Sequence, residues 1–102
     1  MTTKYRKQKV NKKINITERN IFEGEIANPQ NCAIARAIKK NMKGKISSIS
    51  VLPSHVNIKI KNKNYTATMP EIGASFIKRF DKGEAVNSFV LNLNFKPGFQ
   101  LA

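Results

Sequence analysis

Two segments of the chain alternate apolar and polar residues with a period of two, and this pattern constrains the fold more than any other feature. In residues 89–95 every second residue is Phe or Leu, and in residues 55–60 every second residue is Val or Ile. Such alternation is typical of antiparallel strands with one buried face and one face in water. The chain therefore needs more strands and a covering layer to bury these apolar rows.

Apolar residues at three- and four-residue spacing predict helices that can supply this layer. One helix is expected from Cys32 to Lys43 with Asn31 as its N-cap, and another over residues 70–82. A brief helix over residues 18–23 follows Thr17, whose side chain can cap it. The helices would pack on one face of the sheet and leave the other face open.

The expected order of elements is β-α-α-β-β-β-α-β. It predicts a small α+β protein, a two-layer sandwich with an antiparallel sheet of four to five strands and helices on one face. We expect one folded domain over residues 14–96. A flexible basic arm over residues 1–13 would precede it, and a short tail over residues 97–102 would follow it.

The charge of the chain is strongly one-sided. It has 19 Lys and Arg residues against six Asp and Glu residues, a formal net charge of +13, and no acid occurs between Glu25 and Glu71. A field of this sign concentrates polyanions, which predicts a nucleic-acid partner, RNA or DNA, single- or double-stranded. An AT-rich genome would also raise the number of lysines, so codon bias is a second explanation for part of the charge.

The basic residues fall into three groups that together predict a phosphate-binding surface. They are the arm (Lys4, Arg6, Lys7, Lys9, Lys12 and Lys13), one face of the 32–43 helix (Arg36, Lys39, Lys40 and Lys43), and a hairpin (Lys59, Lys61 and Lys63). Lysine outnumbers arginine, which favours salt-sensitive phosphate contacts with little sequence preference. Tyr5 and Tyr65 could stack on bases, although Tyr65 could equally belong to the core.

Catalytic signatures are sparse, and we expect a protein that is not an enzyme and holds no cofactor or metal. The single histidine, His55, would need an orienting carboxylate, and the acid nearest to it in sequence is Glu71. Cys32 could have a lowered pKa in the first turn of a helix, assisted by Arg36, or could pack as a small hydrophobe. One cysteine and one histidine are too few for an internal disulfide or a structural zinc site.

Localisation signals are also sparse. The chain has no apolar run long enough to cross a membrane, and its basic N-terminus lacks the apolar stretch of a secretory signal. We expect a cytoplasmic protein, in the host cytoplasm if it is viral, that does not associate with membranes. A homodimer could form through an exposed sheet edge, but the sequence leaves the oligomeric state open.

The helix-strand-strand-strand-helix run from Asn31 to Lys82 resembles a double-stranded-RNA-binding domain. The tripeptide Pro53-Ser54-His55 is similar to the Pro-x-His motif in the loop after the first strand of that family, which implies a minor-groove contact for His55. That family's second helix opens with a lysine cluster. Residues 69–73 of this chain offer an acid and no lysine, so the resemblance implies no phosphate contact there.

Four other segments resemble small phage-encoded proteins. They are Ile14–Glu18, Asn31–Ile38, Phe76–Glu84 and Phe89–Leu93. This resemblance implies a viral or prophage origin and brings no activity with it. It adds two alternatives to nucleic-acid binding. One is an interaction protein that inhibits or sequesters an acidic host protein or a nucleotide signal, which would need a pocket or an apolar patch. The other is a structural component of a virion or ribonucleoprotein.

Overall fold

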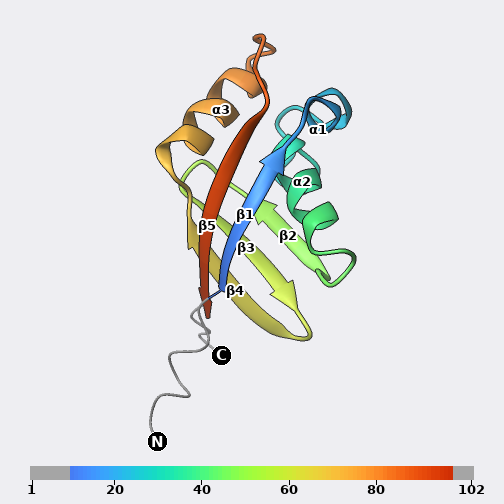
Figure 1. Cartoon of the computed structure of the whole chain (residues 1–102), viewed down its shortest axis with the longest axis vertical. Helices are drawn as coiled ribbons and strands as arrows, with labels where there is room; N and C mark the ends of the chain where they lie inside the picture. The colour runs from blue at the N-terminus through green and yellow to red at the C-terminus, as the bar shows by residue number, and fades with distance from the viewer. Residues whose placement is uncertain (1–9, 98–102) are drawn as a thin grey trace, which may run out of the picture.

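A computed structural model describes residues 10–97 and contains the expected order of elements (Figure 1). The elements are β1 (Val10–Ile16), α1 (Glu18–Glu23), α2 (Ala33–Asn41), β2 (Ser48–Val51), β3 (His55–Ile60), β4 (Lys63–Thr68), α3 (Glu71–Asp81) and β5 (Phe89–Pro97). The strands form one antiparallel sheet in the order β1-β5-β4-β3-β2. The predicted α+β class is confirmed. Within the described residues, no helix is long and apolar enough to cross a bilayer.

β1 begins earlier than the sequence predicted. We expected the strand to start at residue 14, but it starts at Val10, so Lys12 and Lys13 belong to the sheet and not to the arm. The reason is the partner strand: β5 pairs with every residue of β1, and a ladder of backbone hydrogen bonds does not require apolar side chains. The rest of the predicted arm, residues 1–9, and residues 98–102 of the tail lie outside the described residues.

The sheet is curled, and α2 contacts both of its edge strands, β1 and β2 (Figure 1). The buried side of α2 consists of Ala33, Ile34, Ala35, Ala37 and Ile38. These residues join the inward-facing rows of the strands in a single apolar cluster. Ile34 and Ile38 are completely buried, and each such side chain contributes about 1.5–3 kcal/mol by leaving water. The helix thus closes the concave side of the sheet.

β4 and β5 are neighbours in the sheet but pair over only a short length. Their register consists of Tyr65 with Pro97 and Thr66 with Lys96. Beyond these pairs α3 covers the inner side of β5, where the ring centroids of Phe76 and Phe89 lie 4.8 Å apart. The apolar stripe predicted for this helix faces the sheet through Phe76, Ile77 and Phe80, which are buried. The prediction was wrong for Ile72 at the start of the stripe, which is 54% exposed.

The two helix caps expected from the sequence have different outcomes. Thr17 caps α1 as predicted, because its side chain accepts a hydrogen bond from the amide of Asn20 and the Asn20 side chain accepts one from the amide of Thr17. The N-cap of α2 is Cys32, and the prediction of Asn31 in that place was wrong. The side chain of Asn31 instead donates a hydrogen bond to Glu25 and accepts one from Arg36 of α2.

Gly24 marks the point where the end of α1 meets the beginning of α2. Its φ of −71° is available to any residue. Space is the limiting factor, because a Cβ on Gly24 would lie 2.5 Å from the backbone nitrogen of Ala33 and 2.8 Å from its Cα. Backbone atoms of a buried helix start cannot move aside as a side chain can, so the close approach requires glycine.

The substitution Gly24→Ala is therefore expected to destabilise the fold by about 1–3 kcal/mol through overpacking. Gly73→Ala provides the comparison, since the Cβ there would meet mainly the flexible Met69 side chain and alanine favours the helix interior. Urea denaturation of both variants and the unchanged chain measures the difference. An unfolding free energy for Gly24→Ala equal to that of the unchanged chain would contradict the close-approach argument.

Candidate nucleic-acid interface

The charges of the chain are segregated by element. All six acids lie in α1, in α3 or within three residues after these helices: Glu18, Glu23, Glu25, Glu71, Asp81 and Glu84. The five strands and α2 contain no acid at all. The strands instead carry Lys12, Lys13, Lys59, Lys63 and Lys96. The sheet therefore carries positive charge in four of its five strands and no negative charge, and all acids lie in α1, α3 and the loops that follow them.

Side chains that alternate with the buried rows form a surface that we call the outer sheet face. Its members are Asn11, Lys13, Asn15, Ser48, Ser50, His55, Asn57, Lys59, Asn64, Thr66, Thr68, Val90, Asn92, Asn94 and Lys96. Six of them are asparagines and three are lysines, and none is acidic. The face can donate many hydrogen bonds and neutralise anions, but the imidazole of His55 is its only ring, and it lacks the Phe, Tyr and Trp rings on which bases usually stack.

The predicted hairpin lysines lie at the end of the sheet where β3 turns into β4, and of the three only Lys59 belongs to the outer sheet face. Lys61 and Asn62 form the turn between β3 and β4 with φ values of 50° and 65°, the left-handed pair that a two-residue hairpin turn requires. Lys59 lies on the outer sheet face, opposite Asn64, and Lys63 is the first residue of β4. All three remain candidates for phosphate contact.

The sequence reading missed Lys96, which lies two strands away from Lys59 on the same outer sheet face. Strands are about 4.8 Å apart and rise about 3.4 Å per residue, so the Cα atoms of Lys59 and Lys96 are about 12 Å apart. The alternation of Lys96 with the buried Phe95 could have identified it as outward-facing. Its proximity to Lys59 depends on the register of β4 against β5, which the sequence does not reveal.

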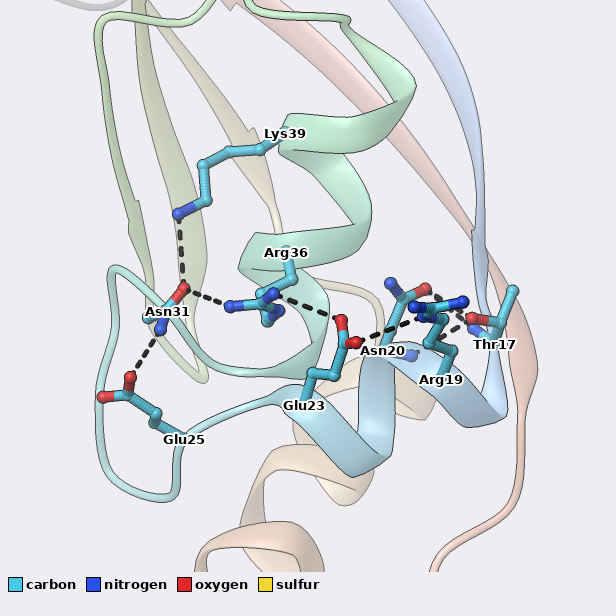
Figure 2. A network of polar contacts seen from close by, with 8 residues as sticks. All are labelled: Thr17, Arg19, Asn20, Glu23, Glu25, Asn31, Arg36 and Lys39. Atoms are coloured by element: carbon cyan, nitrogen blue, oxygen red, sulfur yellow. Dashed lines mark hydrogen bonds and ion pairs between the residues drawn. The ribbon is translucent and has the colours of Figure 1, made fainter.

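Half of the predicted basic face of α2 holds α1 and the loop after it against α2 (Figure 2). Glu23 is held from both sides, by Arg19 Nε at 3.1 Å and by Arg36 Nη2 at 3.2 Å. Arg36 Nη1 also donates to Asn31 Oδ1 at 3.1 Å, and Asn31 Nδ2 donates to Glu25 at 2.6 Å. The guanidinium of Arg36 is therefore committed to the fold.

Lys39 belongs to the same network, while the other two lysines of the predicted face do not. Its Nζ donates to the backbone oxygen of Gln30 at 3.0 Å and lies 3.4 Å from Asn31 Oδ1. Lys40 and Lys43 are exposed and have no acidic or carbonyl partner among residues 10–97. Of the four cations predicted there, Lys40 and Lys43 are the ones left to meet a polyanion.

The carboxylates of this network are stabilised in their charged form. The Arg19 guanidinium, followed by that of Arg36, holds the pKa of Glu23 below its ordinary value of 4.5. Hydrogen bonds from the Asn31 and Asn28 side-chain amides lower the pKa of Glu25 in the same way. Both acids thus stay ionised at neutral pH and keep their partners in place.

The remaining predicted contact residues are placed as follows. Tyr65 lies opposite Ile58, half-buried, and packs against the core instead of projecting from the outer sheet face. His55 begins β3 on the outer sheet face, with its Nδ1 2.7 Å from Ser54 Oγ. Tyr5 lies outside the described residues, as do the arm cations Lys4, Arg6, Lys7 and Lys9.

Cys32 packs in the core as a small apolar residue, and its thiol does not have the lowered pKa of an activated cysteine. It is only 7% exposed, and burial raises its pKa, with the Asp81 carboxylate acting in the same direction. Backbone amides at the start of α2 lower the pKa as expected for a helix N-terminus, but burial outweighs them. No group of three or more His, Cys, Asp or Glu side chains suited to a metal ion occurs within residues 10–97.

The substitution Glu23→Gln tests the network through its pH dependence. Because the pKa of Glu23 is lower in the folded chain than in the unfolded chain, its contribution to stability is full above pH 4.5 and is lost as the pH falls through the folded value. The difference in unfolding free energy between the unchanged chain and the variant should therefore shrink as the pH is lowered below 4.5. Urea titrations at several pH values measure it, and a difference independent of pH would contradict the assignment.

Known proteins provide no template for this surface. The chain was compared with protein-family models, with curated protein sequences and with solved structures, and none of the three comparisons gives a match. The function therefore has to be inferred from the charge, geometry and hydrogen-bonding chemistry of the chain itself.

Proposed function

We propose that this chain is a nucleic-acid-binding protein of phage or prophage type, whose sheet contacts phosphates with little sequence preference. The observation that carries the proposal is the segregation of charge, with five acid-free strands and every acid in or just after α1 and α3. Codon bias towards lysine does not sort charges by structural element. A sheet free of acids, by contrast, can approach a polyanion without repulsion anywhere on its surface.

The arginines support phosphate contact over base reading. All three arginines of residues 10–97 form ion pairs: Arg19 and Arg36 with Glu23, and Arg79 with Glu84. The cations of the sheet are lysines, which act as point charges on phosphates, whereas arginine is the residue that reads guanine with two hydrogen bonds. The described part of the chain thus favours recognition of the backbone over recognition of sequence.

Two further features support the same surface. Val10, to which the basic arm is joined, pairs with Phe95, the neighbour of Lys96, so the arm leaves the sheet at its lysine-bearing end. His55, for which the resemblance to double-stranded-RNA-binding domains implies a groove contact, is on the outer sheet face. Both would add contacts to one continuous surface.

The salt dependence of binding tests the proposal. We expect binding of a labelled duplex, followed by fluorescence anisotropy, to weaken linearly with the logarithm of salt concentration. The double substitution Lys59→Gln and Lys96→Gln should lower the slope by about 1.8, since each lost phosphate contact accounts for about 0.9. A slope unchanged by these substitutions would remove the outer sheet face from the interface.

The matched control is the double substitution Lys78→Gln and Lys82→Gln, which removes the same charge at the end of α3. It should leave the slope nearly unchanged, because that region also holds Asp81 and Glu84. Deletion of residues 1–9 separates the contribution of the arm and leaves β1 complete. If all binding disappears with the arm, the folded body does not bind nucleic acid and the proposal fails.

An interaction protein is the second candidate, and one specific observation favours it. Phe22 of α1 is 89% exposed and Ile26 in the following loop is 52% exposed, so this short segment leaves two large apolar side chains in water. The nearest charges in sequence are those of Glu23 and Glu25. Negative charges of this kind suit a partner with a basic or apolar surface better than an acidic host protein. An interface at these side chains would act separately from the sheet.

The substitution Phe22→Ser distinguishes the two surfaces. If the sheet binds nucleic acid, the affinity for a duplex should stay within about twofold of the unchanged chain, because an exposed side chain in α1 supports neither the core nor the sheet. The same anisotropy assay measures it. A large loss of affinity would mean that α1 belongs to the nucleic-acid interface, contrary to the segregation of charge.

A further inference from the structure

We infer that the groove between β4 and β5 binds the nucleic-acid backbone, and that the chain prefers a duplex to a single strand. This inference rests on the proposed function and adds to it the location of the site and the class of ligand. It follows from the shape of the groove, from the side chains that line it and from what the outer sheet face lacks.

The groove exists because β4 and β5 diverge. The strands pair at Thr66 with Lys96, and no further pair follows in the direction of Thr68. The outer side of this gap is an open groove with a volume of about 640 Å³. Its polar lining consists of Asn11, Thr68, Asn92, Asn94 and Lys96. The strand residues that line it belong to the acid-free sheet.

The lining has the chemistry of a backbone-binding site. Asn11 lies directly opposite Asn94 across the β1–β5 ladder, and Lys13 lies opposite Asn92, so amides and ammonium groups alternate over a few ångströms. An asparagine amide both donates and accepts hydrogen bonds, which suits phosphate oxygens and sugar hydroxyls alike. Lys96 and Lys13 at the two ends would neutralise phosphates that these amides hold.

The preference for a duplex follows from the missing aromatic residues. Proteins that bind single strands stack the bases on exposed aromatic rings, which contributes about 1–3 kcal/mol per base. The outer sheet face has no Phe, Tyr or Trp, and its one ring, the imidazole of His55, lies outside the groove lining. Phe95, which borders the groove, is only 1% exposed. A duplex keeps its bases stacked on each other and presents only its backbone and groove edges, which amides and lysines can contact.

The test places two negative charges in the groove. In the variant Asn92→Asp with Asn94→Asp the side chains keep their shape, and both positions are exposed, so the fold should survive. We expect its dissociation constant for a duplex to rise by about tenfold or more, as amide donors are lost and phosphates are repelled. The matched control, Gln30→Glu with Asn87→Asp, adds the same charge at two exposed positions outside the strands and should change the constant less than about threefold.

A second variant removes the amides without adding charge. Asn92→Thr with Asn94→Thr keeps residues that favour strands, and it should weaken duplex binding by about threefold or more if the amides contact the backbone. Circular dichroism and thermal unfolding of each variant verify the fold. Single-stranded RNA and DNA of the same length should bind more weakly than either duplex at equal salt.

The outcomes separate this inference from the proposed function. If the unchanged chain binds no nucleic acid, the proposed function fails and the inference fails with it. If it binds but the groove variants match the control, the proposed function stands and the groove assignment is overturned. Single strands that bind as tightly as duplexes overturn the preference. A poly-glutamate peptide that binds as tightly as the duplex and is lost in the same variants overturns the nucleic-acid ligand in favour of an acidic peptide.

Discussion

The whole structure depends on the burial of α2 between the two edges of the curled sheet. β1 and β2 are separated by the three other strands in the sheet, yet both contact this one helix. Because Ile34 and Ile38 are completely buried there, the inward rows of all five strands become a single core. A 102-residue chain with one free cysteine has no disulfide to hold it together, so the continuity of this core carries its stability.

Burial of the inward rows of the strands also restricts where charged residues can lie. Strands that give one row to the core must give the alternate row to water, and here that row contains asparagine, serine, threonine and lysine without any acid. Acids are used where the helices need them, in the first turns of α1 and α3 and in the ion pairs that join α1 to α2. Arginine is used in these pairs, which leaves lysine as the cation of the sheet. The placement of acids and arginines in the helices and of lysines in the strands thus supports the fold and also leaves the sheet free of acids for the proposed interface.

Much of the fold was predictable from local pattern. The strands of residues 55–60 and 89–95, the stripe of α3 and the Thr17 cap of α1 depend on neighbours three or four residues away at most, so period and propensity suffice to find them. The candidate site was predictable only in outline. Lys40, Lys43 and the hairpin lysines remain predicted contacts. Lys96 was missed, and Arg36 and Lys39 form contacts within the fold.

The sequence by itself determined the elements, their order, the alternation of buried and exposed rows and the excess of positive charge. Tertiary structure alone decided that Lys12 and Lys13 lie in a strand, that Lys59 and Lys96 share one face, and that a groove opens where β4 leaves β5. It also decided that burial raises the pKa of Cys32 although a helix begins beside it. The physical reason is common to all of these: each depends on which distant residues meet and how much water they exclude, and neither quantity is encoded in local spacing.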